Sequence, residues 1–211
     1  MPVEEGHAKR RQILDGARRI FMELGFDAAS MGEIAKAAGV SKGTLYVYFS
    51  DKNALFVALI EQIAREQGQL AFEAVLEGSS DTRATLQRFG RNYIAFLCRP
   101  EGGSAIRTVI AIAERMPELG HRFYSEVIEK THHRVGEYLS KEVEAGRLRI
   151  PDCQLAGSQF LLACQATLFL PYLFQAPVAL APDNIERVVD SAVDVFMDAY
   201  GVADPRNQGR Q

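Results

Sequence analysis

The chain has 211 residues, of which 47% are hydrophobic and 24% charged, a composition typical of a compact globular protein rather than a disordered or fibrous one. No segment approaches the roughly 20 apolar residues that a spanning helix needs, so neither a membrane span nor a membrane partner is predicted. The net charge of −3 does not by itself favour a nucleic-acid partner. Residues 34–50, however, hold two lysines and no carboxylate, which predicts a local basic surface.

The first eleven residues, MPVEEGHAKRR, carry charges but no apolar segment or small-residue cleavage site. No secretory signal is therefore predicted, and the expected location is cytoplasmic. Cys98, Cys153 and Cys164 are odd in number and form no CxxC pair, which argues against a disulfide framework and a structural zinc site. We interpret them as small buried apolar residues, and we expect no cofactor and no metal.

Apolar residues recur at helical spacing along nearly the whole chain, without an alternating strand pattern or an internal repeat, which predicts an all-α fold of about nine helices. The first helix is expected over residues 9–24, where Gly25 can end it in the left-handed conformation and let Phe26 fold back onto Phe21. The second helix begins at a capping box formed by Ser30 and Glu33. The other helices are expected over residues 42–48 after a Ser41 cap, from Ser50 or Asp51 toward residue 76, and over 82–97, 104–113, 117–145, 154–174 and 184–200.

Residues 30–52, SMGEIAKAAGVSKGTLYVYFSDK, place two short helices on either side of a tight turn at Gly39, Val40 and Ser41. This spacing is typical of a helix-turn-helix. An ordinary helical corner without a DNA-binding role is the alternative on these positions alone. The apolar contacts between the helices are expected from Ile34, Ala35, Ala38, Val40, Leu45 and Tyr48.

The first turn of the third helix carries Lys42, although the helix dipole favours an anionic residue there. This placement predicts an anion close by. Ser41, Gly43 and Thr44 add two hydroxyls and a bare backbone at the same helix end, which suits contacts with phosphate oxygens and base edges.

Further candidates for DNA contact surround this helix. Tyr46 and Tyr48 have phenols that can reach the DNA backbone, and Lys52 repeats the Lys42 arrangement in the first turn of the next helix. A basic group opens the first helix, where proximity to phosphates is expected and a solvated helix end is the alternative. It consists of Lys9, Arg10 and Arg11.

The segment ILDGARRIFMELGFDAASMGEIAKAAGVSKGTLYVYFSDKNALF resembles the DNA-binding domain of the TetR family of bacterial transcriptional regulators. The resemblance covers residues 10–60 at motif level and the rest of the chain in layout. It implies a helix-turn-helix DNA-binding domain over residues 1–52 and a ligand-binding and dimerisation domain over 53–200. Residues 201–211 have too little apolar content to pack and are expected to be a mobile tail.

By this resemblance, the positions that contact operator DNA are Ser41, Lys42, Gly43, Thr44, Tyr46, Val47, Tyr48 and Lys52, with Ser30 as a further phosphate contact. Val47 departs from the family pattern, in which many members carry a polar residue, and it can at most touch a thymine methyl group. Lys42, Thr44 and Tyr46 are therefore the main candidates for reading sequence.

A single recognition helix reads too little sequence, so a homodimer on a palindromic operator is expected. The last two long helices have broad apolar faces, and the resemblance implies that they form a four-helix bundle with a second copy. Packing within one chain is the alternative, which must use part of these faces. The predicted interface residues are Leu161, Leu168, Val189, Val193, Phe196 and Tyr200.

The resemblance also implies a small-molecule effector that binds between the linking helix and its neighbours. Residues 106–124 are similar to those of family members linked to efflux-pump genes, which implies an amphipathic or toxic compound. Side chains that mix apolar surface with hydroxyls are the candidates for lining its cavity, and a dry core is the alternative. They are Phe89, Tyr93, Phe96, Ile110, Met116, Phe123, Tyr124, Phe160, Thr167 and Tyr172.

Nothing in the sequence predicts an enzyme. His132 and His133 are adjacent and diverge by about 100° on a helix, so they do not form a zinc-binding pair. The leading hypothesis is a ligand-responsive dimeric regulator, acting as a repressor, whose partners are a double-stranded DNA operator, a second copy and an effector. A helical enzyme with an internal pocket and an interaction module without sequence-specific DNA binding are the alternatives.

Overall fold

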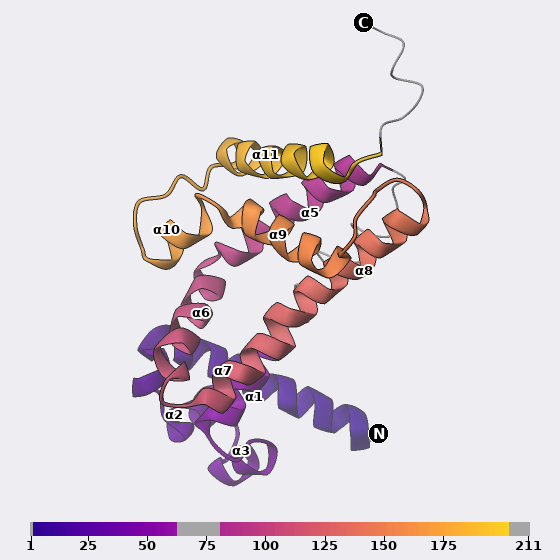
Figure 1. The fold of residues 1–211 in the computed structure, drawn as a ribbon. Coiled ribbons are helices and arrows are strands. Elements are labelled where there is room, and N and C mark those ends of the chain that lie inside the picture. Colours follow the sequence, from indigo (N-terminus) through magenta and orange to yellow (C-terminus); the bar gives the residue numbers. More distant parts are fainter. Residues whose placement is uncertain (1, 63–80, 203–211) are drawn as a thin grey trace, which may run out of the picture. The chain divides into compact units, whose positions relative to one another are not determined.

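The computed structural model describes residues 2–62 and 81–202, which are mostly helical (Figure 1). In these residues the β-type pairing is limited to one isolated antiparallel bridge, between Leu148 and Gly201. The predicted all-α fold is therefore confirmed. The elements are α1 (Pro2–Ala28), α2 (Met31–Ala38), α3 (Lys42–Tyr48), a helix over residues 52–62, α5 (Thr82–Leu97), α6 (Pro100–Ala113), α7 (Pro117–Phe123), the π-helix η1 (Tyr124–Glu129), α8 (Lys130–Glu144), α9 (Cys153–Gln165), α10 (Phe169–Leu173) and α11 (Pro182–Tyr200).

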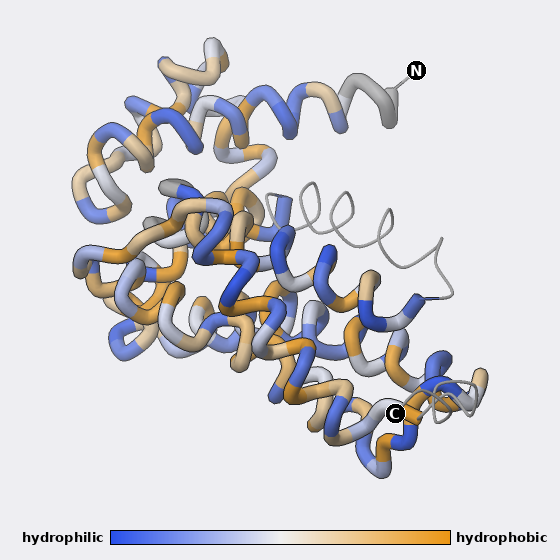
Figure 2. Tube along the Cα trace, turned by 90° about the horizontal axis from the view of Figure 1, so that it is seen from above, coloured by the Kyte–Doolittle hydropathy of each residue, from blue (hydrophilic) through white to orange (hydrophobic). Residues whose placement is uncertain are grey.

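The described residues form two compact units. The first joins residues 2–62 with 104–127, and the second joins 81–103 with 128–202. Hydrophobic and hydrophilic residues alternate along the helices (Figure 2), as helices with one buried face require. The compact units do not coincide with the two predicted functional domains, because residues 104–127 belong to the first unit. The domain boundary expected at residue 52 stays a prediction.

A cluster of aromatic rings lies at the C-terminal end of α1 in the first unit. Gly25 has a positive φ of 77°, which interrupts the helix as predicted, although its ψ of 169° is extended rather than left-handed helical. The Phe26 ring then stacks on Phe21 with 5.7 Å between centroids, and both rings pack against Phe56 from the helix that follows α3. The predicted contact between Phe21 and Phe26 is confirmed.

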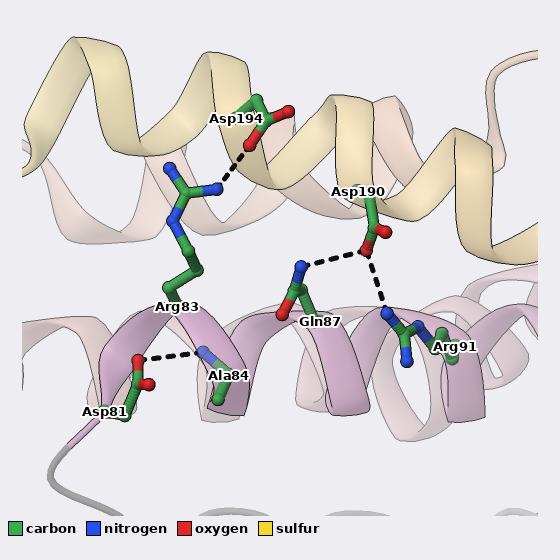
Figure 3. A network of polar contacts seen from close by, with 7 residues as sticks. All are labelled: Asp81, Arg83, Ala84, Gln87, Arg91, Asp190 and Asp194. Carbon is green, nitrogen blue, oxygen red and sulfur yellow. Dashed lines mark hydrogen bonds and ion pairs between the residues drawn. The ribbon is translucent and has the colours of Figure 1, made fainter.

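The second unit is built around α5, α8, α9 and α11, in which α8 packs on α9 and α11 lies along α5. Polar side chains also join α5 to α11 (Figure 3). Asp190 accepts hydrogen bonds from Gln87 and Arg91, both at 3.0 Å, and Arg83 pairs with Asp194. These polar contacts therefore reinforce the apolar contact between the two helices.

The apolar faces that were expected to bind a second copy lie inside this core. Of the six predicted interface residues, Leu161, Leu168, Val189, Val193 and Phe196 are buried within the chain, and Tyr200 packs against them. The reason is that α9 and α11 turn these faces toward α5 and toward each other. Packing within one chain therefore takes up most of the surface of these residues, and their role in a dimer interface stays a prediction.

Two long predicted helices are interrupted. The helix expected over residues 117–145 consists of α7, η1 and α8. The helix expected over 154–174 ends at Gln165 and resumes as α10. Pro171 explains the second break, because it has no N–H to donate to the carbonyl of Thr167 and its ring would clash with that carbonyl.

The two chain positions that begin the predicted tail are paired. Gly201 N donates to the carbonyl of Met197 at 2.8 Å, and Val202 N donates to the carbonyl of Arg147 at 3.2 Å. The rest of the predicted tail, residues 203–211, lies outside the described residues, as does the part of the predicted fourth helix beyond residue 62. No helix in the described part of the chain is long and apolar enough to cross a membrane.

Candidate nucleic-acid interface

The start of α2 is fixed by the predicted capping box. Ser30 Oγ accepts a hydrogen bond from Glu33 N at 3.2 Å, and Ser30 N donates to Glu33 Oε2 at 3.0 Å. The hydroxyl of Ser30 also donates to Glu33 Oε2 at 2.6 Å. These hydrogen bonds hold the pKa of Glu33 below its usual value. The Ser30 hydroxyl, a predicted phosphate contact, is thus bonded to a carboxylate in this structure.

The turn between α2 and α3 has the geometry that the sequence predicts. Gly39 adopts the left-handed conformation, with φ 64° and ψ 37°, which glycine does without strain. Ser41 then caps α3, because its Oγ accepts from Thr44 N at 3.0 Å and pairs with Thr44 Oγ1 at 2.8 Å. The helices are held together by buried apolar side chains. They are Ile34, Ala35, Ala38 and Leu45.

The outer face of α3 is open to solvent. The side chain of Val47 is 82% exposed and that of Tyr46 is 52% exposed, and Lys42 and Gly43 are exposed as well. Leu45, by contrast, is completely buried against α2. Thr44 and Tyr48 are half-buried. The predicted contact residues of α3 therefore form one end and one exposed face of a short, firmly anchored helix.

Side chains of α1 cap the end of α2, which sequence reasoning did not find. Gln12 Nε2 donates to the carbonyl of Ala38 at 2.7 Å, and Arg19 donates to the carbonyl of Ala37. These carbonyls lack partners within α2. No local sequence signal marks the two side chains, because their partners lie more than fifteen residues away. α1 therefore fixes the orientation of the helix-turn-helix through polar contacts as well as apolar ones.

Lys9 and Arg10, of the basic group at the start of α1, make contacts within the protein. The guanidinium of Arg10 lies 5.4 Å from the centre of the Phe49 ring, next to the end of α3. Lys9 Nζ donates to Gln12 Oε1 at 3.0 Å, and Arg11 is exposed. The fold thus brings this group to the helix-turn-helix.

Lys42 and Lys52 have different surroundings, although the sequence pattern treats them alike. Lys42 is exposed and its side chain lies over Gly32, where an added Cβ would stand 2.9 Å from Lys42 Cε. Lys52 is half-buried, and its Nζ donates to the carbonyls of Phe26, Asp27 and Ala29. The ammonium of Lys52 is therefore turned into the protein, whereas Lys42 stays exposed at the start of α3.

The predicted cavity residues are not gathered at one place. Phe89, Tyr93 and Phe160 belong to the core of the second unit, where Gln165 Nε2 donates to Tyr93 Oη at 2.7 Å. Ile110 and Tyr124 are more than half exposed. Phe96, Met116 and Tyr172 are half-buried, and Thr167 is exposed. The dry-core alternative therefore describes the first three residues.

Phe123 is the predicted cavity residue that lines a hollow in the first unit. This apolar hollow of about 200 Å³ lies between residues 56–61, α6 and α7, and Val127. Glu61 stands at its edge and pairs with Arg122 at 2.9 Å. The hollow has almost no free space for a water-sized molecule, so it is not an open ligand pocket in this structure.

The described residues contain no group of three or more histidine, cysteine, aspartate or glutamate side chains that could hold a metal ion. His132 Nδ1 is hydrogen-bonded to Ser158 Oγ at 2.9 Å, between α8 and α9. Its partial burial lowers its pKa. His132 therefore packs between these two helices.

Two family models match the chain. The model of the bacterial regulatory proteins of the tetR family matches residues 13–59, which contain the helix-turn-helix. The model of the C-terminal domain of AefR-like transcriptional repressors matches residues 84–202. Together they cover most of the described residues.

Relatives and solved structures agree with these matches. The transcriptional repressor AcnR of Corynebacterium diphtheriae is 37% identical over 90% of this chain and 94% of its own. A crystal structure of a TetR-family protein from Mesorhizobium loti superposes with a TM-score of 0.86, at 29% identity over 93% of this chain and 98% of that one. The flavonoid-responsive regulator FrrA superposes with a TM-score of 0.78, at 29% identity over 94% and 100%.

Several other regulators match over 74–84 residues, and for them the chain spans only 37–42% of the relative's length. These shorter matches are 38–44% identical. The relatives are transcriptional regulators rather than enzymes. The chain accordingly belongs to the TetR family and is a DNA-binding transcriptional regulator.

Proposed function

We propose that the protein is a ligand-responsive dimeric repressor that binds a palindromic operator through α3 and is released by a small-molecule effector. The observation that carries this proposal is the outer face of α3, where Lys42, Tyr46 and Val47 are exposed while Leu45 is buried. A helix of this kind can enter the major groove without disturbing the packing behind it. Because an operator lies on the chromosome, a cytoplasmic location is part of the proposal.

Each predicted contact residue of α3 and its N-cap has a role in the proposal. Lys42 and Tyr46 reach the phosphate backbone or base edges, and the hydroxyl of Thr44 is a further candidate for base contact. Gly43 leaves room for close approach of a phosphate to the backbone, and Val47 touches a thymine methyl group. Ser41 and Tyr48 hold the helix and contribute phosphate contacts at its two ends.

Binding to DNA from beside the protein's own gene tests this proposal. We expect Lys42→Ala and Tyr46→Ala to weaken binding by about tenfold or more each, because every lost base or phosphate contact removes about 1–3 kcal/mol. Matched controls are Lys141→Ala, an exposed lysine of α8, and Tyr124→Ala, whose side chain is 55% exposed. Equal effects of the α3 variants and their controls would contradict the proposal.

A homodimer is part of the proposal because two half-sites are needed for useful specificity. The buried residues of α9 and α11 are taken up within the chain, so the interface is assigned to their exposed neighbours. Leu162 on α9 is 59% exposed, and Val195 on α11 is 68% exposed. Large apolar side chains with this exposure are suited to burial against a second copy.

The effector is proposed to act through the first unit. The hollow beside Phe123 adjoins the helix that follows α3, so a compound that widens it would move that helix. FrrA, to which this chain is similar, is named as flavonoid-responsive, which supports a small organic effector. Linkage sets the test, because an effector that weakens DNA binding by some factor must itself bind the DNA-bound protein more weakly by the same factor.

A further inference from the structure

Lys52 stands in the first turn of the helix that follows α3, and its ammonium is bonded within the protein. Nζ donates to the carbonyl oxygens of Phe26 at 2.7 Å, Asp27 at 3.0 Å and Ala29 at 2.9 Å. An ammonium has three N–H donors and no acceptor, so these bonds use its full capacity. The cation also lies 4.6 Å from the centre of the Phe26 ring.

The three carbonyls belong to the turn that ends α1 and leads into α2. Carbonyl groups at a helix end lack partners within the helix and carry the negative end of its dipole, so a cation is favoured there. Ala29 directly precedes Ser30, which is the N-cap of α2. The ammonium therefore holds the backbone at the point where α2 begins.

Lys52 is itself held in place. Asp51 accepts hydrogen bonds from Asn53 N and Ala54 N, both at 2.8 Å, and so caps the helix in which Lys52 lies. These hydrogen bonds keep the pKa of Asp51 below its usual value. The bond from Lys52 to Ala29 thus links the start of α2 to the start of the helix that follows α3. The residues between them, 30–51, contain the whole helix-turn-helix.

We propose that Lys52 is a positioning residue that closes the helix-turn-helix into a rigid loop through the carbonyls of Phe26, Asp27 and Ala29. This assignment replaces the phosphate contact expected from the sequence. It rests on the proposed DNA-binding function, because the loop that Lys52 closes is the one that presents α3. Loss of the ammonium loosens the start of α2 but leaves the number of neutralised phosphates unchanged.

The experiment compares Lys52→Met with Lys42→Met, since both variants remove an ammonium from the first turn of a helix. Thermal unfolding and DNA affinity are measured for each full-length protein, with affinity determined well below Tm over a series of salt concentrations. For Lys52→Met we expect a Tm lower by about 5 °C and DNA binding weaker on the order of tenfold. Its slope of log affinity against log salt should equal that of the unaltered protein.

For Lys42→Met we expect the opposite pattern. Its Tm should stay within about 1 °C, because exposed substitutions change stability little, and its salt slope should fall in magnitude by about 0.9, as for one lost phosphate contact. Lys52→Arg gives a further distinction. A phosphate contact would accept arginine, whereas its planar guanidinium cannot direct three donors to three converging carbonyls, so we expect Lys52→Arg to lower Tm as well.

An unchanged Tm for Lys52→Met, together with a salt slope reduced by about 0.9, would overturn the proposal. A Lys52→Arg protein with the Tm and affinity of the unaltered chain would do the same. If Lys52→Met does not fold, Lys52→Arg decides between the two roles. If the unaltered protein shows no salt-dependent DNA binding, the proposed function fails, and the Tm values of the two Lys52 variants still decide whether Lys52 closes the loop.

Discussion

Gly16 on α1 lies directly against Ala38 on α2, so close that a Cβ at Gly16 would stand 2.7 Å from Cα, Cβ and N of Ala38. The absence of a side chain lets the two helix backbones approach to this distance. Gln12 and Arg19, on the same helix as Gly16, cap the carbonyls of Ala38 and Ala37 at this crossing. This close crossing, with a polar contact on either side, therefore fixes the helix-turn-helix against α1.

Gly16→Ala should lower the free energy of unfolding by about 2 kcal/mol, because backbone atoms of α2 must move to admit the methyl group. This loss outweighs the preference of helices for alanine over glycine, which is about 1 kcal/mol. Gly6→Ala is the control, since an added Cβ at Gly6 meets nothing within 4 Å and should be neutral or slightly stabilising. Denaturant unfolding of both variants checks this, and similar stabilities would argue against a tight crossing.

Glu142 should make the second unit less stable in acid. Its buried carboxylate accepts hydrogen bonds from Arg147 Nε at 2.7 Å, from Arg147 Nη2 at 2.8 Å and from Thr82. The bonds from Arg147, and after them the bond from Thr82, lower its pKa. The unfolded chain therefore binds this proton more tightly than the folded one. The stabilisation is present above the unfolded pKa of about 4.3 and is lost as pH falls through the lower folded value.

Glu142→Gln should accordingly lose about 2 kcal/mol at pH 7, as one charge-assisted partner of Arg147 is removed. The difference in Tm between the unaltered protein and this variant should shrink as the pH is lowered from 7 toward 3.5. Glu144→Gln, an exposed neighbour on α8, controls for the change in net charge. A Tm difference that does not depend on pH would mean that the Glu142 carboxylate is not the source of the stabilisation.

The proposed dimer interface predicts that some substitutions prevent dimerisation without unfolding the chain, and that others unfold it. Leu162→Glu or Val195→Glu should give a folded monomer, because a carboxylate on either exposed position opposes burial against a second copy. Met22→Glu, at a side chain of α1 that is 55% exposed, should leave the assembly unchanged. Leu161→Ala should instead destabilise the fold by about 2–4 kcal/mol, since Leu161 is fully buried within the chain.

Light scattering after size-exclusion chromatography measures the mass of each variant, and circular dichroism its helical content. A dimeric Leu162→Glu together with a dimeric Val195→Glu protein would place the interface elsewhere. A monomeric unaltered protein would contradict the dimer itself.

Short-range sequence patterns predicted much of the local structure of the helix-turn-helix and of the end of α1. The capping box of Ser30 and Glu33, the left-handed Gly39 and the Ser41 cap all depend on residues three or four positions apart, and such short-range hydrogen bonds are legible in sequence. The stacking of Phe26 on Phe21 belongs to the same class, because one glycine determines it. In each of these cases the partners are neighbours in the chain.

Features that depend on distant partners could not be predicted in the same way. Helical periodicity marked an apolar face on α9 and α11, but it does not say whether that face is covered by the same chain or by a second copy, and the structure covers it with α5. Lys52 and Lys42 share a helical position, yet Lys52 meets carbonyls more than twenty residues away. The π-helix within residues 117–145 contains no proline or glycine from which the break in the α-helix could have been predicted.

The salt dependence of binding to DNA from beside the protein's own gene tests the central claim most directly, with Lys42→Ala measured alongside. We predict that affinity falls on the order of 10³-fold between 50 and 200 mM salt if about six phosphates are neutralised, and that Lys42→Ala both weakens binding and flattens this dependence. An absence of salt-sensitive binding, or a Lys42→Ala protein with unaltered affinity and slope, would contradict the assignment of α3 as the recognition helix.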